Sequence, residues 1–341
     1  MINNSTVQAL THFKLNTATE FEFLKKYYNE PHRFYHNENH INDMVSMVEN
    51  NCQDFSERDR NIMVAAVLYH DVIYDVKSKT NEEDSASLFE NHVSGHAIPK
   101  KDIDEVVQII LDTKHTSKPR STLGEVICNF DLAGLKRGDL NRVRQDEWNI
   151  MLEYQQYEYA DYRKGRIDFL EGFLKSNNDI NGSNIRTLID IVKNRVLNIG
   201  VYAGSFNPLH KGHLNIIEKA EKIFDKVIIA RGTNPDKKNE SLQDWNYLTK
   251  YRQVDLYATD LPDYLKSKAN FANITLIRGL RNGHDLDYEM NQLRFLEDMD
   301  PTIEVVFIPC DKQYEHISSS AIRSMQNFSP ALSLKSTAYY K

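Results

Sequence analysis

The chain has 341 residues, which is enough for two domains of ordinary size, each with its own hydrophobic core. A net charge of −7, with both signs mixed along the chain, argues against non-specific nucleic-acid binding. The 3 cysteines, Cys52, Cys128 and Cys310, fit neither a disulfide framework nor a Cys-x-x-Cys metal site. Residues 1–20 lack the features of a signal peptide, and no apolar run approaches the ~18 residues of a membrane span, so we expect a soluble cytoplasmic protein.

Residues 1–195 are predicted to be almost entirely helical. Apolar residues recur there at three- and four-residue spacing, whereas the alternation typical of strands is nearly absent. Turn-forming pairs such as Lys118-Pro119 separate the segments. The segments with helical spacing are Phe21–Tyr28, Ile41–Val48, Asn61–Tyr69, Ile103–Leu111, Trp148–Tyr159 and Ile167–Leu174.

Ionisable residues interrupt the apolar pattern of this half. His36 and His40 are four residues apart, and His70-Asp71 ends a long apolar run. Asp131 interrupts a second run. Burying such groups is costly unless they are paired or bind a metal. Because histidine and carboxylate ligands from several helices can converge on one divalent cation, the pattern predicts a metal site.

Between about Thr17 and Lys175 the sequence resembles the HD superfamily of metal-dependent phosphohydrolases. This resemblance implies an all-helical fold and hydrolysis of a phosphorylated substrate whose identity is left open. It rests on the segments Pro31–Ile41, His70–Asp75, Asn81–Ala86 and Asn129–Leu132.

The HD resemblance also implies roles for individual side chains. Asp75 and Glu83 lie where a carboxylate would activate or position water. His115 is implied as a ligand of a second metal or of a substrate phosphate. The implied cation is Mn²⁺, Fe²⁺, Co²⁺ or Mg²⁺, and its implied ligands are His40, His70, Asp71 and Asp131.

From about Asn198 the pattern changes to alternating strands and helices, which implies parallel strands joined by right-handed crossovers. We therefore predict an all-α domain of HD type over residues 1–195 and an α/β, Rossmann-like domain with a parallel sheet over residues 196–341. The expected strands are Asn198–Ala203, Lys226–Arg231, Ile274–Arg278 and Glu304–Pro309.

The segment Gly200–His213 joins the first expected strand to a helix. It reads Gly-Val-Tyr-Ala-Gly-Ser-Phe-Asn-Pro-Leu-His-Lys-Gly-His, and Leu214, Ile217, Ala220 and Phe224 continue it at helical spacing. A tight turn between strand and helix directs backbone N–H groups and the positive end of a helix dipole at a ligand, normally a phosphate. Gly204 and Gly212 allow close approach, and His210 and His213 add donors, so a nucleotide site is predicted.

This segment resembles the His-x-Gly-His signature of the nucleotidyltransferase superfamily. Two later blocks, Arg278–Met290 and Ile317–Arg323, resemble those of the phosphopantetheine adenylyltransferase family, in the same order. The resemblance covers about Asn198–Met325. It implies transfer of AMP from ATP to 4′-phosphopantetheine in coenzyme A synthesis, with release of pyrophosphate and with Mg²⁺ on the triphosphate.

The same resemblance implies roles for residues of the second half. His213 would donate to the α-phosphate, and Arg281 would lie over the triphosphate. Lys237, with Lys238 as the alternative, would bridge the α-phosphate and the acceptor phosphate. The implied acceptor-binding residues are Ser205, Lys237 and Arg278. The implied ATP-binding residues are Gly204, Ser205, Phe206, His210, His213, Arg281, Glu289, Ser318, Ser319 and Ser320.

Departures from the family pattern leave the acceptor open. Asn207 replaces the aspartate usual before the proline of the first block, and residues 239–250 do not follow the family. Nicotinamide-mononucleotide adenylyltransferase, in NAD synthesis, stays an alternative, as does a nucleotide-sensing regulatory protein. The polar tail after Arg323 is short compared with the family's final helices, so a homo-oligomer is neither required nor excluded.

Overall fold

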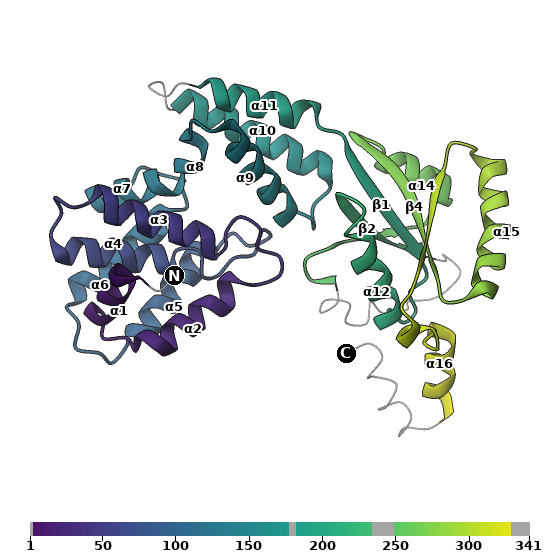
Figure 1. Ribbon diagram of the computed structural model, residues 1–341, viewed down its shortest axis with the longest axis horizontal. Helices are drawn as coiled ribbons and strands as arrows, with labels where there is room; N and C mark the ends of the chain where they lie inside the picture. The colour runs from purple at the N-terminus through teal and green to yellow at the C-terminus, as the bar shows by residue number, and fades with distance from the viewer. Residues whose placement is uncertain (1–2, 177–181, 234–248, 329–341) are drawn as a thin grey trace. The chain divides into compact units, whose positions relative to one another are not determined.

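The structure is a computed structural model that describes the chain except for residues 1–2, 177–181, 234–248 and 329–341 (Figure 1). The chain forms two compact units. The first comprises Met1–Tyr154 and Leu170–Ile189, and the second comprises Gln155–Phe169 and Asp190–Lys341. Residues 155–169 thus group with the second unit, whereas the predicted division at 195/196 assigns them to the helical half.

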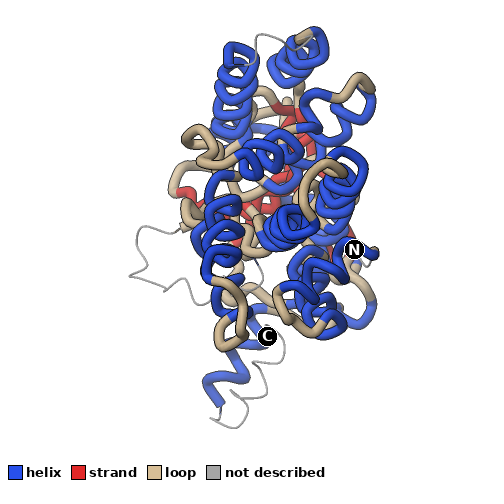
Figure 2. Tube along the Cα trace, turned by 90° about the vertical axis from the view of Figure 1, so that its left-hand side faces the viewer, coloured by secondary structure: helices blue, strands red, loops and turns tan. Residues whose placement is uncertain are grey.

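The chain up to residue 194 is helical wherever the structure describes regular elements, and the strands seen in Figure 2 all belong to one later sheet. Short polar side chains begin several of these helices: Asn16, Ser56 and Ser121 each accept a backbone N–H of the first turn. The helices are α1 (Asn4–His12), α2 (Thr17–Tyr28), α3 (Glu38–Asn51), α4 (Glu57–Tyr69), α5 (Asn81–Val93), α6 (Lys100–Asp112), α7 (Thr122–Asp131), α8 (Ala133–Lys136), α9 (Leu140–Glu153), α10 (Tyr159–Ser176) and α11 (Ser183–Asn194).

Helix α4 is at the centre of the first unit. Every residue from Asn61 to Tyr69 is buried, as expected of a helix that has neighbours on all sides. Helices α1, α3, α5, α6 and α7 pack against it (Figure 1). Its last turn continues into His70 and Asp71, so a helix fixed by its surroundings positions two of the predicted metal ligands.

The second unit contains a five-stranded sheet in the order β3-β2-β1-β4-β5 (Figure 1). All of its pairings are parallel, with Ile199 opposite Lys226 and Leu197 opposite Ala272 on the two sides of β1. This confirms the predicted fold class. The strands are β1 (Leu197–Gly204), β2 (Lys226–Gly232), β3 (Gln253–Tyr257), β4 (Ala272–Leu280) and β5 (Glu304–Pro309).

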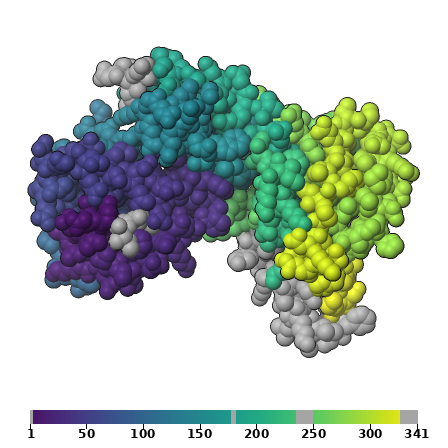
Figure 3. Space-filling model, viewed as in Figure 1, coloured from purple at the N-terminus to yellow at the C-terminus, as the bar shows by residue number. Residues whose placement is uncertain are grey.

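Helices connect and cover these strands. The short 3-10 helix η1 (Lys312–Tyr314) follows β5. Helix α15 contains no buried residue, and the space-filling view shows it in light green at the surface of its unit (Figure 3). None of the helices in the described part of the chain has the length and hydropathy needed to span a bilayer. The remaining helices of this unit are α12 (Lys211–Ala220), α14 (Leu261–Lys268), α15 (Gly283–Met299) and α16 (Ser319–Phe328).

Three local expectations were wrong. The helix predicted over Trp148–Tyr159 is interrupted, because α9 ends at Glu153 and α10 begins at Tyr159. Strand β3 was not expected at all. Helix α12 ends at Ala220, so Phe224 lies outside it; its ring instead packs where a Cβ on Gly200 would lie, only 2.6 Å from that position.

Candidate functional sites

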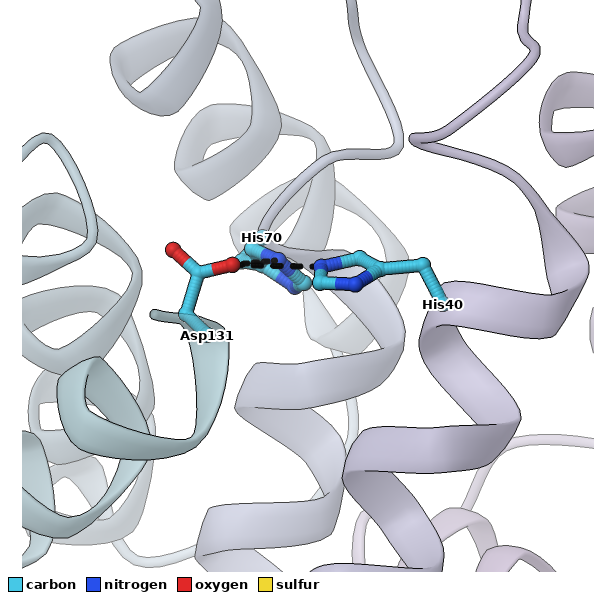
Figure 4. A group of neighbouring side chains, drawn as sticks. All are labelled: His40, His70 and Asp131. Atoms are coloured by element: carbon cyan, nitrogen blue, oxygen red, sulfur yellow. Dashed lines mark hydrogen bonds and ion pairs between the residues drawn. The ribbon is translucent and has the colours of Figure 1, made fainter. Parts of the chain in front are cut away.

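Three of the predicted ligand residues of the first unit, His40, His70 and Asp131, meet at one place (Figure 4), and Asp71 lies beside them. Nε2 of His40, on α3, is 3.1 Å from Oδ1 of Asp131, at the end of α7. Nε2 of His70, directly after α4, is 3.1 Å from Oδ2 of Asp71 and 3.8 Å from Oδ1 of Asp131. Ligand atoms of His40, His70 and Asp131 all lie within 4.8 Å of one another. Two nitrogen and two carboxylate donors are a suitable set for a divalent cation.

The environment of His70 fits a metal ligand in particular. Its Nδ1 is 2.9 Å from the carbonyl oxygen of Val67, which can only accept, so the ring carries a proton on Nδ1. Nε2 is buried and has no hydrogen-bond partner within the described ranges. A backbone carbonyl that fixes the far nitrogen of a ligating histidine is the usual support of a metal site. Nε2 therefore points at the cluster as the atom that would bind.

His115 joins this cluster through Asp131. Its Nε2 is 2.8 Å from Oδ2 of Asp131, and its φ of 54° lies in the left-handed region. Burial disfavours the charged form of Asp131, but hydrogen bonds from His115 and His40, together with the nearby ring of His70, lower its pKa well below the usual value. Asp131 is therefore held as a carboxylate between three imidazole rings.

Asp75 and Glu83, the predicted water-positioning carboxylates, have other partners. Oδ1 of Asp75 accepts the backbone N–H of Lys77 at 2.9 Å. Glu83 is an exposed residue, and its carboxylate is 2.5 Å from Nζ of Lys114, which lowers its pKa. Their assigned roles stay predictions.

Glu153 supports this site and was missed in the sequence, because nothing in its local pattern marks it. Its buried Oε1 accepts the backbone N–H groups of Phe34, Tyr35 and His36 at 2.7–2.9 Å. Its Oε2 is 2.6 Å from Nδ1 of His36 and accepts the hydroxyl of Tyr74 at 2.8 Å. One carboxylate thus holds both the loop that leads into α3 and the loop that follows His70-Asp71.

The predicted nucleotide site lies at the carboxyl end of the sheet in the second unit. Strands β2 and β4 flank β1, so the order of the strands reverses beside β1. Open parallel sheets bind ligands at such a switch point. A cavity of about 290 Å³ opens there, and the predicted residues that line it are His210, His213, Arg281, Glu289, Ser318, Ser319 and Ser320.

The two histidines of the His-x-Gly-His segment begin α12. Their rings stack with centroids 3.7 Å apart, and the backbone N–H of His210 donates to Nδ1 of His213 at 3.2 Å. Burial, then Arg281, lower the pKa of His210 to about 4, and burial, His210 and Arg281 lower that of His213 well below its usual value. Both rings are therefore neutral near pH 7. Because Nδ1 of His213 accepts, its proton is on Nε2, which is the donor needed for a phosphate oxygen.

Both predicted arginines are held by acidic residues of α15. Nε and Nη2 of Arg281 donate to the carboxylate of Asp285 at 2.8 Å, and the backbone N–H of Arg281 adds a bond of 2.9 Å. Nε of Arg278 is 3.3 Å from Oε2 of Glu289, and its Nη1 donates to the carbonyl of Ala203. The second unit therefore offers fixed positive charge beside the cavity, and Asp285 was not assigned a role from the sequence.

The predicted serines form the beginning of α16. The hydroxyl of Ser318 accepts the backbone N–H of Ala321 at 3.1 Å, so this residue caps the helix. The hydroxyl of Ser319 donates to the carbonyl of Pro208 at 2.9 Å and connects α16 to the His-x-Gly-His segment. The positive end of this helix faces the cavity that Ser318–Ser320 line.

Gly204, Ser205 and Phe206 are predicted residues within the described part of this unit that do not line the cavity. Gly204 ends β1, Ser205 is exposed, and Phe206 is buried with its ring edge-on to His213. Lys237, and residues 239–248 of the divergent segment, lie outside the described residues.

A parallel α/β sheet with such a segment at its switch point defines the second unit as a nucleotidyltransferase domain. The family described as cytidylyltransferase-like matches residues 201–325. Phosphopantetheine adenylyltransferase of Clostridium botulinum strain Hall is 36% identical over 136 residues, which are 38% of this chain and 81% of that protein. The enzyme of strain Eklund 17B is 37% identical over 140 residues, which are 39% of this chain and 86% of that enzyme. The chain thus belongs, through its second unit, to the cytidylyltransferase-like family and is a homologue of the phosphopantetheine adenylyltransferases.

The family match lies within the second unit. The resemblance of the first unit to HD phosphohydrolases stays a prediction, supported by the geometry around His70.

Proposed function

We propose that the second unit transfers the adenylyl group of ATP to the phosphate of 4′-phosphopantetheine. The observation that carries the proposal is the homology to phosphopantetheine adenylyltransferases, of which the match covers 81% in one relative. An oxygen of the acceptor phosphate forms a bond to the α-phosphorus, the bond to the bridging oxygen breaks, and pyrophosphate leaves. Because the acceptor is already an anion, the protein needs to position the reactants and stabilise charge.

The residues around the cavity suit these two tasks. The Nε2–H group of His213 is proposed to donate a hydrogen bond to an oxygen of the α-phosphate, where negative charge increases in the transition state. Arg281 is proposed to pair with the triphosphate, and the start of α16 with its terminal phosphates. Lys237 keeps its proposed place between the two reacting phosphates, and Arg278 its place at the acceptor. Mg²⁺ would accompany ATP as part of the substrate.

The test is pyrophosphate release from ATP and Mg²⁺ by the full chain, with two acceptors compared. Release with 4′-phosphopantetheine alone is the expected result. Release with nicotinamide mononucleotide alone would replace the proposed acceptor, and release with neither would favour a nucleotide sensor.

We also propose that the first unit binds a divalent cation and hydrolyses a phosphate ester. The observation in favour is the buried Nε2 of His70, which points at two carboxylates while Nδ1 is fixed on Val67. A bound cation would lower the pKa of a coordinated water and neutralise phosphoryl charge. Asp75 stays the proposed residue for positioning that water, and Glu83 would first have to leave Lys114. The proposed ligands are His40, His70, Asp71 and Asp131.

This proposal is tested by the metal content of the full chain after incubation with Mn²⁺ and dialysis. We expect about one tightly bound ion per chain and metal-dependent hydrolysis of p-nitrophenyl phosphate. A chain that retains no ion would refute the proposal, whatever the second unit does.

A further inference from the structure

The first unit contains two histidines in nearly identical chemical settings. Nδ1 of His36 is 2.6 Å from Glu153, which also accepts the hydroxyl of Tyr74. Nδ1 of His92 is 2.8 Å from Glu20, which also accepts the hydroxyl of Tyr69. The two side chains are 23% and 21% exposed.

The two groups of histidine, glutamate and tyrosine differ in what lies beside the histidine ring. His36 is edge-on to the ring of His40, with centroids 5.9 Å apart, so it lies at the edge of the metal-ligand cluster. His92 is edge-on to the ring of Phe23, with centroids 4.6 Å apart. The same pairing of a histidine with a glutamate that accepts a tyrosine hydroxyl thus lies once against a polar cluster and once against an apolar side chain.

The glutamate decides which ring nitrogen of His36 is available to a ligand. Because Nδ1 donates to Glu153, Nε2 is on the opposite edge of the ring. Nε2 has no hydrogen-bond partner within the part of the chain that the structure describes. The ring itself is held by a tilted contact with Tyr74, whose centroid is 4.4 Å away. His36 is therefore a fixed side chain with one unused polar atom.

We propose that His36 contacts the phosphoryl group of the substrate through Nε2, and that Glu153 positions the ring of His36 for this contact. The inference rests on the proposed metal-dependent hydrolysis in this unit. Glu153 occupies Nδ1, so Nε2 is the ring atom left to exchange a hydrogen bond with a phosphate group. A phosphate bound at the cluster would meet this atom beside His40. The substrate class is thus a phosphate monoester or a terminal phosphate.

The variant His36→Asn separates substrate contact from structural support. The amide nitrogen of asparagine can lie where Nδ1 lies and keep the bond to Glu153, but nothing in asparagine replaces Nε2. We would load the full chain with Mn²⁺ and titrate inorganic phosphate, following the broadening of its phosphorus NMR signal by the ion. This signal reports only phosphate near the ion, so binding in the second unit does not interfere.

We expect His36→Asn to retain Mn²⁺ and to bind phosphate ~10-fold to 100-fold more weakly than the unchanged protein. His92→Asn is the matched control, and it should leave phosphate affinity unchanged. The proposal is overturned if His36→Asn binds phosphate normally, if it loses an ion and so proves to be a metal ligand, or if His92→Asn weakens binding equally. Loaded protein that binds no phosphate at all also overturns it. Absence of bound Mn²⁺ in the unchanged protein would instead refute the proposed function.

Discussion

Each unit brings two histidine rings together, and the two pairs have opposite surroundings. The rings of His40 and His70 are 5.6 Å apart among carboxylates, whereas those of His210 and His213 are 3.7 Å apart beside Arg281. Burial disfavours the charged form of His70, but Asp71 and Asp131 outweigh burial and raise its pKa. Burial and Arg281 act in the same direction on His210 and lower its pKa to about 4.

The comparison shows that neighbouring charge decides what a buried histidine can bind. A pair surrounded by carboxylates attracts positive charge, which suits a metal cation. A neutral pair of imidazoles can donate N–H hydrogen bonds to a polyphosphate, and the neighbouring arginine supplies the positive charge that attracts it. If the two sites differ in this way and act independently, a substitution in one of them should leave the other unchanged.

The largest effect is expected from His213→Ala. Loss of the Nε2 donor should reduce adenylyl transfer by ~10²-fold to 10³-fold, because such donors act mainly in the transition state. Binding of ATP, measured by calorimetry, should change little. His284→Ala removes an exposed histidine of the same unit and is the control. Unchanged pyrophosphate release in His213→Ala would remove this residue from the proposed mechanism.

A smaller effect is expected when the carboxylate-rich pair is changed. His70→Ala and Asp71→Ala should weaken metal binding by ~100-fold, the upper end of the range found even for residues that only support ligands. Adenylyl transfer by the same proteins should be unaffected. Metal analysis and pyrophosphate release measure the two effects. Simultaneous loss of both would contradict two independent sites.

The third prediction concerns acid sensitivity of the second unit. The pKa of His210 is about 4 when folded and 6.5 in its reference state, so the unfolded chain takes up a proton first as the pH falls. His210 should therefore lower the free energy of unfolding by about 2 kcal/mol between pH 7 and pH 5. Hydrogen exchange of the amides in β1 measures this energy. In His210→Asn the free energy of unfolding should fall by about 2 kcal/mol less between pH 7 and pH 5 than in the unchanged protein. An equal fall in both proteins would show that the ring of His210 is protonated in the folded state.

The smallest effect is expected from Asp285→Asn. Arg281 would lose the partner that aligns its guanidinium beside the cavity, and because the pair is partly exposed we expect only ~1 kcal/mol, or about fivefold weaker ATP binding. Asp287→Asn changes an exposed residue of the same helix and is the control. Tighter binding of ATP by Asp285→Asn would mean that Asp285 competes with the triphosphate instead of aligning Arg281.

The sequence predicted the regular parts of the fold because they follow apolar periodicity. Strand β3 was not predicted because it is an edge strand in which Gln253 and Asp255 interrupt the apolar residues. The break between α9 and α10 was not predicted for a different reason. Residues 154–158 contain no glycine or proline that would mark it, yet the chain changes there from the first compact unit to the second.

The candidate sites were predictable where a motif is short and local. The His-x-Gly-His segment is local, and seven of the residues predicted with it line one cavity. His36 precedes α3 instead of sharing a helix face with His40, because Asn37 caps that helix. The partner that fixes His36, Glu153, is 117 residues away in the chain, a distance over which no spacing rule operates.

That separation has a consequence for the order in which the first unit can be completed during synthesis. All of the proposed metal ligands have been made once residue 131 has left the ribosome, but the carboxylate that gathers the amides of residues 34–36 belongs to the end of α9. Contacts between such distant segments form late, since a long loop must close first. A nascent chain that stops before α9 would carry every ligand and still lack the residue that shapes the approach to them.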